Sequence, residues 1–217
     1  GAQIAELAAV NSKDVSFIVL LSGNGVDGGK VLIEQQKLIL KASGVADSLI
    51  TQNLDLQSKI NNALLNDVDL NNIRKDIRAF AEKDYAGLNK EVKNSIQNKE
   101  TYINSNVQSQ ITVFNNPWFR YYVKYDPIPT LERIKIPVLM LFGELDLQFP
   151  PSLNKQRMEE ALVKAGNKNF KSIVFPKANH LYQEAKIGSP TEYSELKKEF
   201  VPGFLETIGD WIRTVIK

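Results

Sequence analysis

Two residues in the second half of the sequence have the types and the spacing for acid–base chemistry. Asp146 lies four residues beyond the apolar run PVLMLF, and His180, the only histidine, follows the run KSIVFP. If both runs are adjacent parallel strands, the two side chains project from the same edge of a sheet. A carboxylate there can hold an imidazole in the tautomer that a general base needs. The alternatives are that Asp146 caps the following helix and that His180 is a surface histidine, and the spacing alone leaves them open.

The elements that must position this pair can be predicted from hydrophobic periodicity. Near-continuous apolar runs predict three strands, and the first of them, rich in β-branched residues, is typical of a strand buried on both faces of a parallel sheet. These strands are expected at residues 15–21, 137–142 and 170–175. Apolar residues at spacings of three and four predict helices at residues 2–11, 153–165 and 200–216, and a series of helices from 31 to about 110. The order of elements therefore predicts an α/β fold with parallel strands and a helical insertion between the first and second strands.

Composition limits the classes of function. The 217 residues are 43% hydrophobic, enough for one sizeable core, and the net charge of +2 gives no argument for binding nucleic acid. Without cysteine and with a single histidine, the chain offers no disulfide, thiolate metal site or multi-histidine metal site. It also lacks an apolar run of membrane-spanning length and the pattern of a signal peptide. We expect a soluble protein with no metal and no cofactor, and leave open whether it is cytoplasmic or exported.

The stretch SGNGVDGG after the first predicted strand contains the spacing G-x-G-x-x-G. A dinucleotide-binding site would need a second parallel strand about 20 residues further on, ending in an acidic residue, and none is predicted there. A phosphate-binding loop would need a hydroxyl residue after Lys30, where the chain has Val31. We therefore expect the glycines to end the strand and to permit close backbone approach, with Gly23 lining a substrate pocket.

Four segments resemble bacterial α/β-hydrolases of the dienelactone-hydrolase-like, carboxylesterase group that carry a helical cap. They are IAELAAVNSKDVSFIVLLSGNGV, NPWFRYYVKYDP, IPVLMLFGELDLQFPP and NHLYQEAKIGSPTEYSE. The resemblance extends from Gly1 to the C-terminal helix and is weakest in the cap. It implies the C-terminal part of an α/β-hydrolase fold, in which parallel strands with flanking helices form the core at residues 1–30 and 117–217, and the cap spans 31–116.

The same resemblance implies roles for four residues. Asp146 matches the acid and His180 the base of a catalytic triad. Trp118 and Phe119 are similar to aromatic residues that border the active site and contact substrate. The alternative for these two aromatics is packing between cap and core, because large aromatics at a domain junction usually bury area.

One departure from the family concerns the nucleophile. In the family, the segment that resembles IAELAA follows the nucleophile elbow G-x-S-x-G-G, and here Gly1 and Ala2 stand at its closing positions. Ser12, Ser22 and Ser189 lie elsewhere in the predicted fold, so the resemblance implies that the nucleophile serine is not in this chain. Either the chain is part of a longer hydrolase, the interpretation we favour, or it is a short protein that completes its sheet with a second copy.

The resemblance implies a serine hydrolase, most simply a carboxylesterase that acts on a small-molecule ester when complete, whereas this chain alone is expected to be inactive. A peptidase or a thioesterase is the alternative within the same class, since the fold supports many such chemistries. A non-catalytic interaction module is the alternative from another class. The expected partners are the ester and the segment or second copy that completes the sheet, with no nucleic acid and no membrane span.

Overall fold

The computed structural model describes residues 1–216, and the chain divides into two compact units. The sheet unit contains residues 1–45 and the chain from Asp126 onward, and the helical unit contains residues 46–125. The inserted region was expected over residues 31–116. Helix α2 (Gly28–Ala42) belongs to the sheet unit, and helix α7 (Pro117–Lys124), which packs on helices α3 (Asp47–Leu65) and α6 (Lys99–Asn115), belongs to the helical unit.

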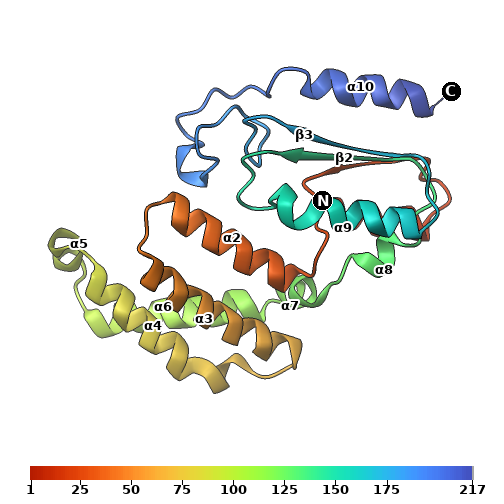
Figure 1. Ribbon diagram of the computed structural model, residues 1–217. Coiled ribbons are helices and arrows are strands. Elements are labelled where there is room, and N and C mark those ends of the chain that lie inside the picture. The colour runs from red at the N-terminus through yellow and green to blue at the C-terminus, as the bar shows by residue number, and fades with distance from the viewer. Residues whose placement is uncertain (217) are drawn as a thin grey trace. The chain divides into compact units, whose positions relative to one another are not determined.

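The sheet has three parallel strands, which confirms the predicted α/β class. Strand β2 (Val138–Gly143) lies between β1 (Ile18–Leu21) and β3 (Phe170–Phe175), as Figure 1 shows for β2 and β3. Ile18 is paired with Val138, and Val138 is paired with Phe170, so all three strands end at the same edge. Helix α9 (Pro151–Lys164) is the crossover between β2 and β3. The loops that carry Asp146 and His180 therefore leave the sheet side by side.

Helices cover both faces of the sheet. Helices α1 (Ala2–Asn11), α8 (Ile128–Leu131) and α9 contribute to a core on one face, and α10 (Phe204–Val215) packs on the other, as the positions of α9 and α10 in Figure 1 show. The first core is centred on Leu20, Met140 and Phe142. The second contains Leu141 and Trp211. Alternate residues of β2 thus enter opposite cores, and every residue of this central strand is buried.

Strand β1 differs from the prediction in length and burial. It begins at Ile18 rather than Val15, where its partner β2 also begins. The expectation that this strand is buried on both faces is wrong: Ile18 and Leu20 are buried, but Leu21 is 45% exposed. The reason is its place at the edge of the described sheet, since it pairs with β2 alone. Burial on both faces belongs to the central strand.

The helical unit consists of packed amphipathic helices, as their spacing predicted. Residues 46–125, all of which the structure describes, form α3, η1 (Leu70–Ile73), α4 (Arg74–Gly87), α5 (Lys90–Ser95), α6 and α7. Asparagine side chains mark several helix starts: Asn98 accepts the N–H of Thr101 at the start of α6, and Asn116 accepts that of Trp118 at the start of α7. Helix α4 packs on α6 and α3 on α7, which buries their apolar faces.

Candidate active site

Asp146 is placed by a tight loop that begins where β2 ends. The N–H of Leu145 donates to the carbonyl of Ala178 at 2.8 Å, which ties this loop to the one that follows β3. Gly143 is required at the contact, because a Cβ there would lie 2.5 Å from the carbonyl oxygens of both Ala178 and Asn179. The two loops are thus held together by backbone contacts, independently of the Asp146 and His180 side chains.

His180 lies in a tight turn that another side chain organises. Asn179 accepts the N–H groups of Leu181 and Gln183 at 2.9 and 3.0 Å through its side-chain oxygen. Ala178 and Glu184 pair as an antiparallel bridge that closes the turn. His180 is therefore presented by a loop whose backbone is already hydrogen-bonded, so little conformational freedom is left to lose when the imidazole is positioned.

The structure brings Asp146 and His180 together. Oδ2 of Asp146 lies 2.9 Å from Nδ1 of His180, and Oδ1 accepts the N–H groups of Gln148 and Phe149, each at 2.8 Å. The Asp146 side chain is fully buried, whereas that of His180 is 27% exposed. The helix-cap alternative for Asp146 is wrong, because α9 begins at Pro151 with Pro150 as its cap residue. The surface-histidine alternative does not fit a ring that is held by a buried carboxylate.

The environment keeps the Asp146 carboxylate charged. Burial by itself raises the pKa of Asp146, but the hydrogen bond and charge of His180, the N–H of Phe149 and the hydroxyl of Ser22 together lower it below its usual value. An ionised carboxylate accepts a hydrogen bond from the Nδ1–H of His180, and Nε2 is then the ring nitrogen that carries no proton. Phe149 stacks on the imidazole with ring centres 5.5 Å apart, which further fixes its plane. The arrangement is that of a general base with its orienting acid.

Gly23 lies in the sheet unit, where it packs against α9. A Cβ at Gly23 would lie 2.5 Å from Cε of Met158, and one at Gly25 would lie 2.3 Å from the carbonyl oxygen of Asn154. Asn154 also accepts the N–H of Gly25 at 2.9 Å. The glycines after β1 therefore permit the close backbone approach that was expected, whereas pocket lining by Gly23 stays a prediction.

Trp118 and Phe119 lie on α7 in the helical unit, not in the unit that holds Asp146 and His180. The Trp118 side chain is exposed and stacks on Tyr122 with ring centres 5.6 Å apart and nearly parallel planes. Phe119 meets Phe114 edge to face at 5.0 Å. The two residues form part of an aromatic cluster within their own unit, and their contact with substrate stays a prediction.

The three serines weighed as nucleophiles each have another partner. Ser12 accepts the N–H of Asp14, and the Ser189 hydroxyl pairs with Thr191. The Ser22 hydroxyl lies 3.1 Å from that of Tyr182. Sequence reasoning gave Ser22 no role and missed Tyr182. The available signals were a hydroxyl residue directly after a strand and a tyrosine two residues after the histidine.

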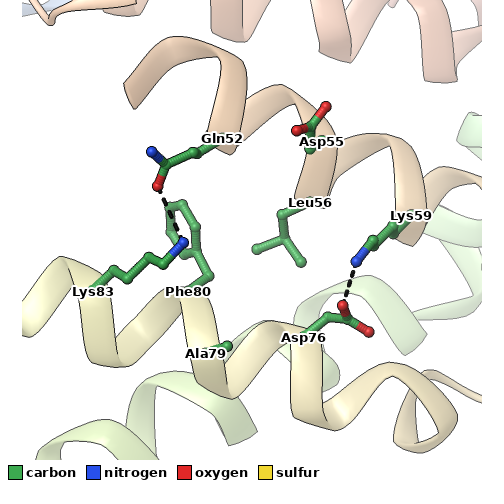
Figure 2. Close-up of a pocket in the computed structure, with 8 residues that line it drawn as sticks. All are labelled: Gln52, Asp55, Leu56, Lys59, Asp76, Ala79, Phe80 and Lys83. Atoms are coloured by element: carbon green, nitrogen blue, oxygen red, sulfur yellow. Dashed lines mark hydrogen bonds and ion pairs between the residues drawn. The ribbon is translucent and has the colours of Figure 1, made fainter. Parts of the chain in front are cut away.

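The helical unit has a hollow of its own between α3 and α4. Figure 2 shows Leu56 and Phe80 in the hollow, flanked by the ion pair of Lys59 with Asp76 and by the hydrogen bond from Lys83 to Gln52. No hydroxyl or histidine is among the eight labelled residues. This hollow therefore offers no hydroxyl nucleophile and no histidine base.

Comparisons with known proteins agree with a hydrolase. A family model described as "BAAT / Acyl-CoA thioester hydrolase C terminal" matches residues 77–184, a range that includes Asp146 and His180. No curated protein matches the chain. The match places a hydrolase-family region over residues 77–184, and the parallel sheet, with the acid and the histidine after consecutive strands, fits the C-terminal part of an α/β-hydrolase fold.

Two solved structures are similar to the chain. One is MenH from S. aureus, with 14% identity, a TM-score of 0.42, and coverage of 100% of this chain and 66% of that one. The other is the putative non-heme bromoperoxidase BpoC from Mycobacterium tuberculosis H37Rv, with 17% identity, a TM-score of 0.41, and coverage of 99% and 64%. The chain thus spans just under two thirds of the length of each.

Within residues 1–216, none of the helices combines the length and the apolar character that crossing a membrane requires.

Proposed function

On the premise that this chain carries the C-terminal part of an α/β-hydrolase, we propose that the protein is a serine-type acyl hydrolase in which Asp146 and His180 are the acid and the base. The observation that carries the proposal is the 2.9 Å contact between a buried, ionised Asp146 and a partly exposed His180 at the carboxyl edge of a parallel sheet. Ligand chemistry in such sheets is located at this edge.

In the proposed reaction, His180 acts as a base and then as an acid in each of two half-reactions. It takes the proton of a serine hydroxyl as that oxygen attacks the acyl carbonyl, and the imidazolium is stabilised by Asp146. It then gives the proton to the leaving oxygen or sulfur as the carbonyl bond to that atom breaks. Water, deprotonated by the same imidazole, cleaves the acyl-serine to release the acid and restore the serine.

The serine is proposed to come from outside the described residues. Strand β1 ends in an exposed apolar residue, Leu21, and pairs on one side only, which supports a further strand beside it. We favour a strand and serine from a segment of the protein that precedes Gly1, with a second copy of the chain as the alternative. Light scattering separates these: a dimer of the 217-residue chain supports the second copy.

A small ester is the proposed substrate, with a thioester as the second candidate. The second candidate is favoured by the description of the family model over residues 77–184, which names an acyl-CoA thioester hydrolase. Both share the same acyl chemistry and differ in the leaving atom. Trp118 and Phe119 are proposed to contact the acyl group, because aromatic rings offer a large apolar surface and that of Trp118 is exposed. Gly23 is proposed to line the pocket of the acyl group.

The test is hydrolysis by the full-length protein that contains this chain. We expect it to hydrolyse p-nitrophenyl acetate or an acyl thioester, and we expect the His180→Gln variant to lose at least about 1,000-fold in kcat/KM. The control is Asp210→Asn, at an exposed position on α10, which should retain full activity. Activity that survives His180→Gln would refute the role of His180. Failure of a fluorophosphonate probe to label the full-length protein would instead support a non-catalytic interaction module.

A further inference from the structure

One residue, Phe149, contacts both members of the acid–base pair. Its main-chain N–H donates to Oδ1 of Asp146 at 2.8 Å, and its ring stacks on the imidazole of His180. We propose that Phe149 is a positioning residue, whose ring holds the imidazole in the orientation in which Nε2 takes the proton of a nucleophile. The inference rests on the proposed function for its catalytic meaning, whereas both contacts belong to the described structure.

The hydrogen bond to Asp146 does not by itself fix the plane of the imidazole. It holds the ring at one atom, Nδ1, and the ring can still tilt about this contact. The lone pair of Nε2 lies in the ring plane, and a hydrogen bond weakens steeply when donor and acceptor are misaligned, so a tilted ring is a poor base. The His180 side chain is 27% exposed, so its neighbours do not enclose it on every side. A second constraint on the ring plane is therefore needed.

The Phe149 ring supplies this second constraint. The two ring centres are 5.5 Å apart and the planes differ by 19°, which is an offset and nearly parallel stack. The imidazole cannot tilt toward a phenyl ring in this position without a clash. The face of a phenyl ring also attracts a cation that lies within about 6 Å of its centre. The stack therefore suits the imidazole before it takes up a proton and the imidazolium afterwards.

The backbone of Phe149 is itself restrained on both sides. Gln148 and Phe149 both donate their N–H groups to Oδ1 of Asp146 at 2.8 Å, which fixes the chain on the N-terminal side of the ring. The next two residues are prolines, and a proline restricts the residue before it to extended conformations. The side chain of Gln148 donates to the hydroxyl of Tyr193 at 2.9 Å. Of the two residues that hold Oδ1, Phe149 is thus the one whose side chain is stacked on the imidazole.

The position of Phe149 differs from that of a phenylalanine that only stabilises the fold. Phe142 is fully buried in one core of the sheet unit, and Phe175 and Phe204 are buried in the other. Among the described residues, Phe149 belongs to neither of these two cores, and it is half-buried. Its ring contact is with the proposed base instead. The ring is therefore placed to act on His180 rather than to fill the interior of the sheet unit.

The test compares a substitution that removes the ring with one that keeps it. Phe149→Leu retains an apolar side chain and the main-chain N–H that Asp146 accepts, so it removes the stack alone. Phe149→Tyr retains the ring. The control is Phe200→Leu in the sheet unit, where a phenylalanine that is 52% exposed contacts the ring of Phe204, with ring centres 4.8 Å apart.

The first readout is NMR of the 217-residue chain. The two carbon-bound imidazole protons are assigned without ambiguity, because His180 is the only histidine. A stacked aromatic ring shifts the signals of nearby protons through its ring current. Phe149→Leu should therefore move at least one of the two signals at both the low-pH and the high-pH plateau of their titration, whereas Phe149→Tyr and Phe200→Leu should leave both nearly in place. Unmoved signals in Phe149→Leu would overturn the inference.

The second readout is hydrolysis by the full-length protein. We expect Phe149→Leu to lower kcat by about tenfold with little change in KM, because a misoriented base slows proton transfer without removing a contact with substrate. Phe149→Tyr and Phe200→Leu should stay close to the wild type. If Phe149→Leu equals the wild type, or if its loss is in KM alone, the inference fails and the proposed function stands. If NMR shows the stack but the wild type hydrolyses no acyl substrate, the proposed function fails while the positioning of the His180 ring by Phe149 stands.

Discussion

Asp146 in the sheet unit and Arg78 in the helical unit are held in opposite ways. In the sheet unit, Asp146 is buried, its oxygens accept backbone and side-chain donors, and the loops around it are hydrogen-bonded to each other. In the helical unit, Arg78 on α4 pairs with Glu82 and Glu100 in the open. The first arrangement fixes a geometry that chemistry needs. The second arrangement follows from charged residues on solvated helix faces, and it constrains the positions of these side chains only weakly.

This difference predicts that a single methyl group is tolerated in one unit and not in the other. Gly143→Ala should destabilise the sheet unit by about 4 kcal/mol or more, because the added Cβ meets two carbonyl oxygens at 2.5 Å that belong to backbone and cannot move aside. The matched control is Gly87→Ala at the end of α4, where a Cβ would meet nothing within 4 Å. It should be neutral or slightly stabilising.

Urea unfolding can follow the two units separately. The chain has two tryptophans, Trp211 in the sheet unit and Trp118 in the helical unit. Single-tryptophan backgrounds made with Trp118→Phe or Trp211→Phe therefore report one unit each. Equal stability of Gly143→Ala and wild type by the Trp211 signal would show that the loops after β2 and β3 are not locked together as described.

The second prediction concerns Glu6, a charge-bearing residue of the sheet unit that the proposed mechanism does not use. Its side chain is fully buried on α1, and neither carboxyl oxygen has a hydrogen-bond partner among the described residues. Burial raises the pKa of Glu6 to about 8. The folded state therefore binds a proton that the unfolded state releases near pH 4.5, so stability should fall as pH rises from about 5 to 8.

Glu6→Gln should remove most of this pH dependence. At pH 7 the raised pKa corresponds to roughly 3 kcal/mol of lost stability, which the uncharged amide does not incur. Stability measured by urea unfolding at several pH values should then be nearly constant across this range in the variant. Glu91→Gln on the exposed face of α5 is the control and should keep the wild-type slope. The same slope in Glu6→Gln would mean that another group causes the pH dependence.

The strands and helices could be predicted from the sequence because their apolar residues recur at regular spacings. The burial of single residues could not, because it depends on contacts with distant parts of the chain. The runs that became β2 and β3 were predicted almost to the residue, and in β2 the run is apolar on both faces because this central strand is covered on both. Asp146 and His180 were predicted because strand ends in a parallel sheet share one edge. The exposure of Leu21 was not predicted. It depends on whether another strand lies beside β1, which the apolar run of β1 itself does not indicate.

Ser22, Tyr182 and Glu6 could not be predicted for a related reason. Ser22 and Tyr182 are 160 residues apart, and nothing in either local segment indicates that their hydroxyl groups meet. Glu6 occupies a helix position beside the alanines that face the core, where a sequence pattern predicts a solvated carboxylate. Polar residues that are buried by contacts distant in sequence leave no periodic signal.

The smallest expected effect is in the helical unit, at the ion pair between Arg78 of α4 and Glu100 of α6. Arg78 donates to Glu100 and to Asn104, and all these side chains are in contact with solvent. Arg78→Gln should change the stability reported by Trp118 less than Gly143→Ala or Glu6→Gln changes that of the sheet unit, and the change should vanish at high salt, because water and ions screen exposed charges. The matching variant in the sheet unit is Asp146→Asn. Its effect on the stability reported by Trp211 should persist at the same salt concentration, because salt screens a buried contact far less. A loss on Arg78→Gln that is large and insensitive to salt would show that the helical unit, too, depends on a fixed polar geometry.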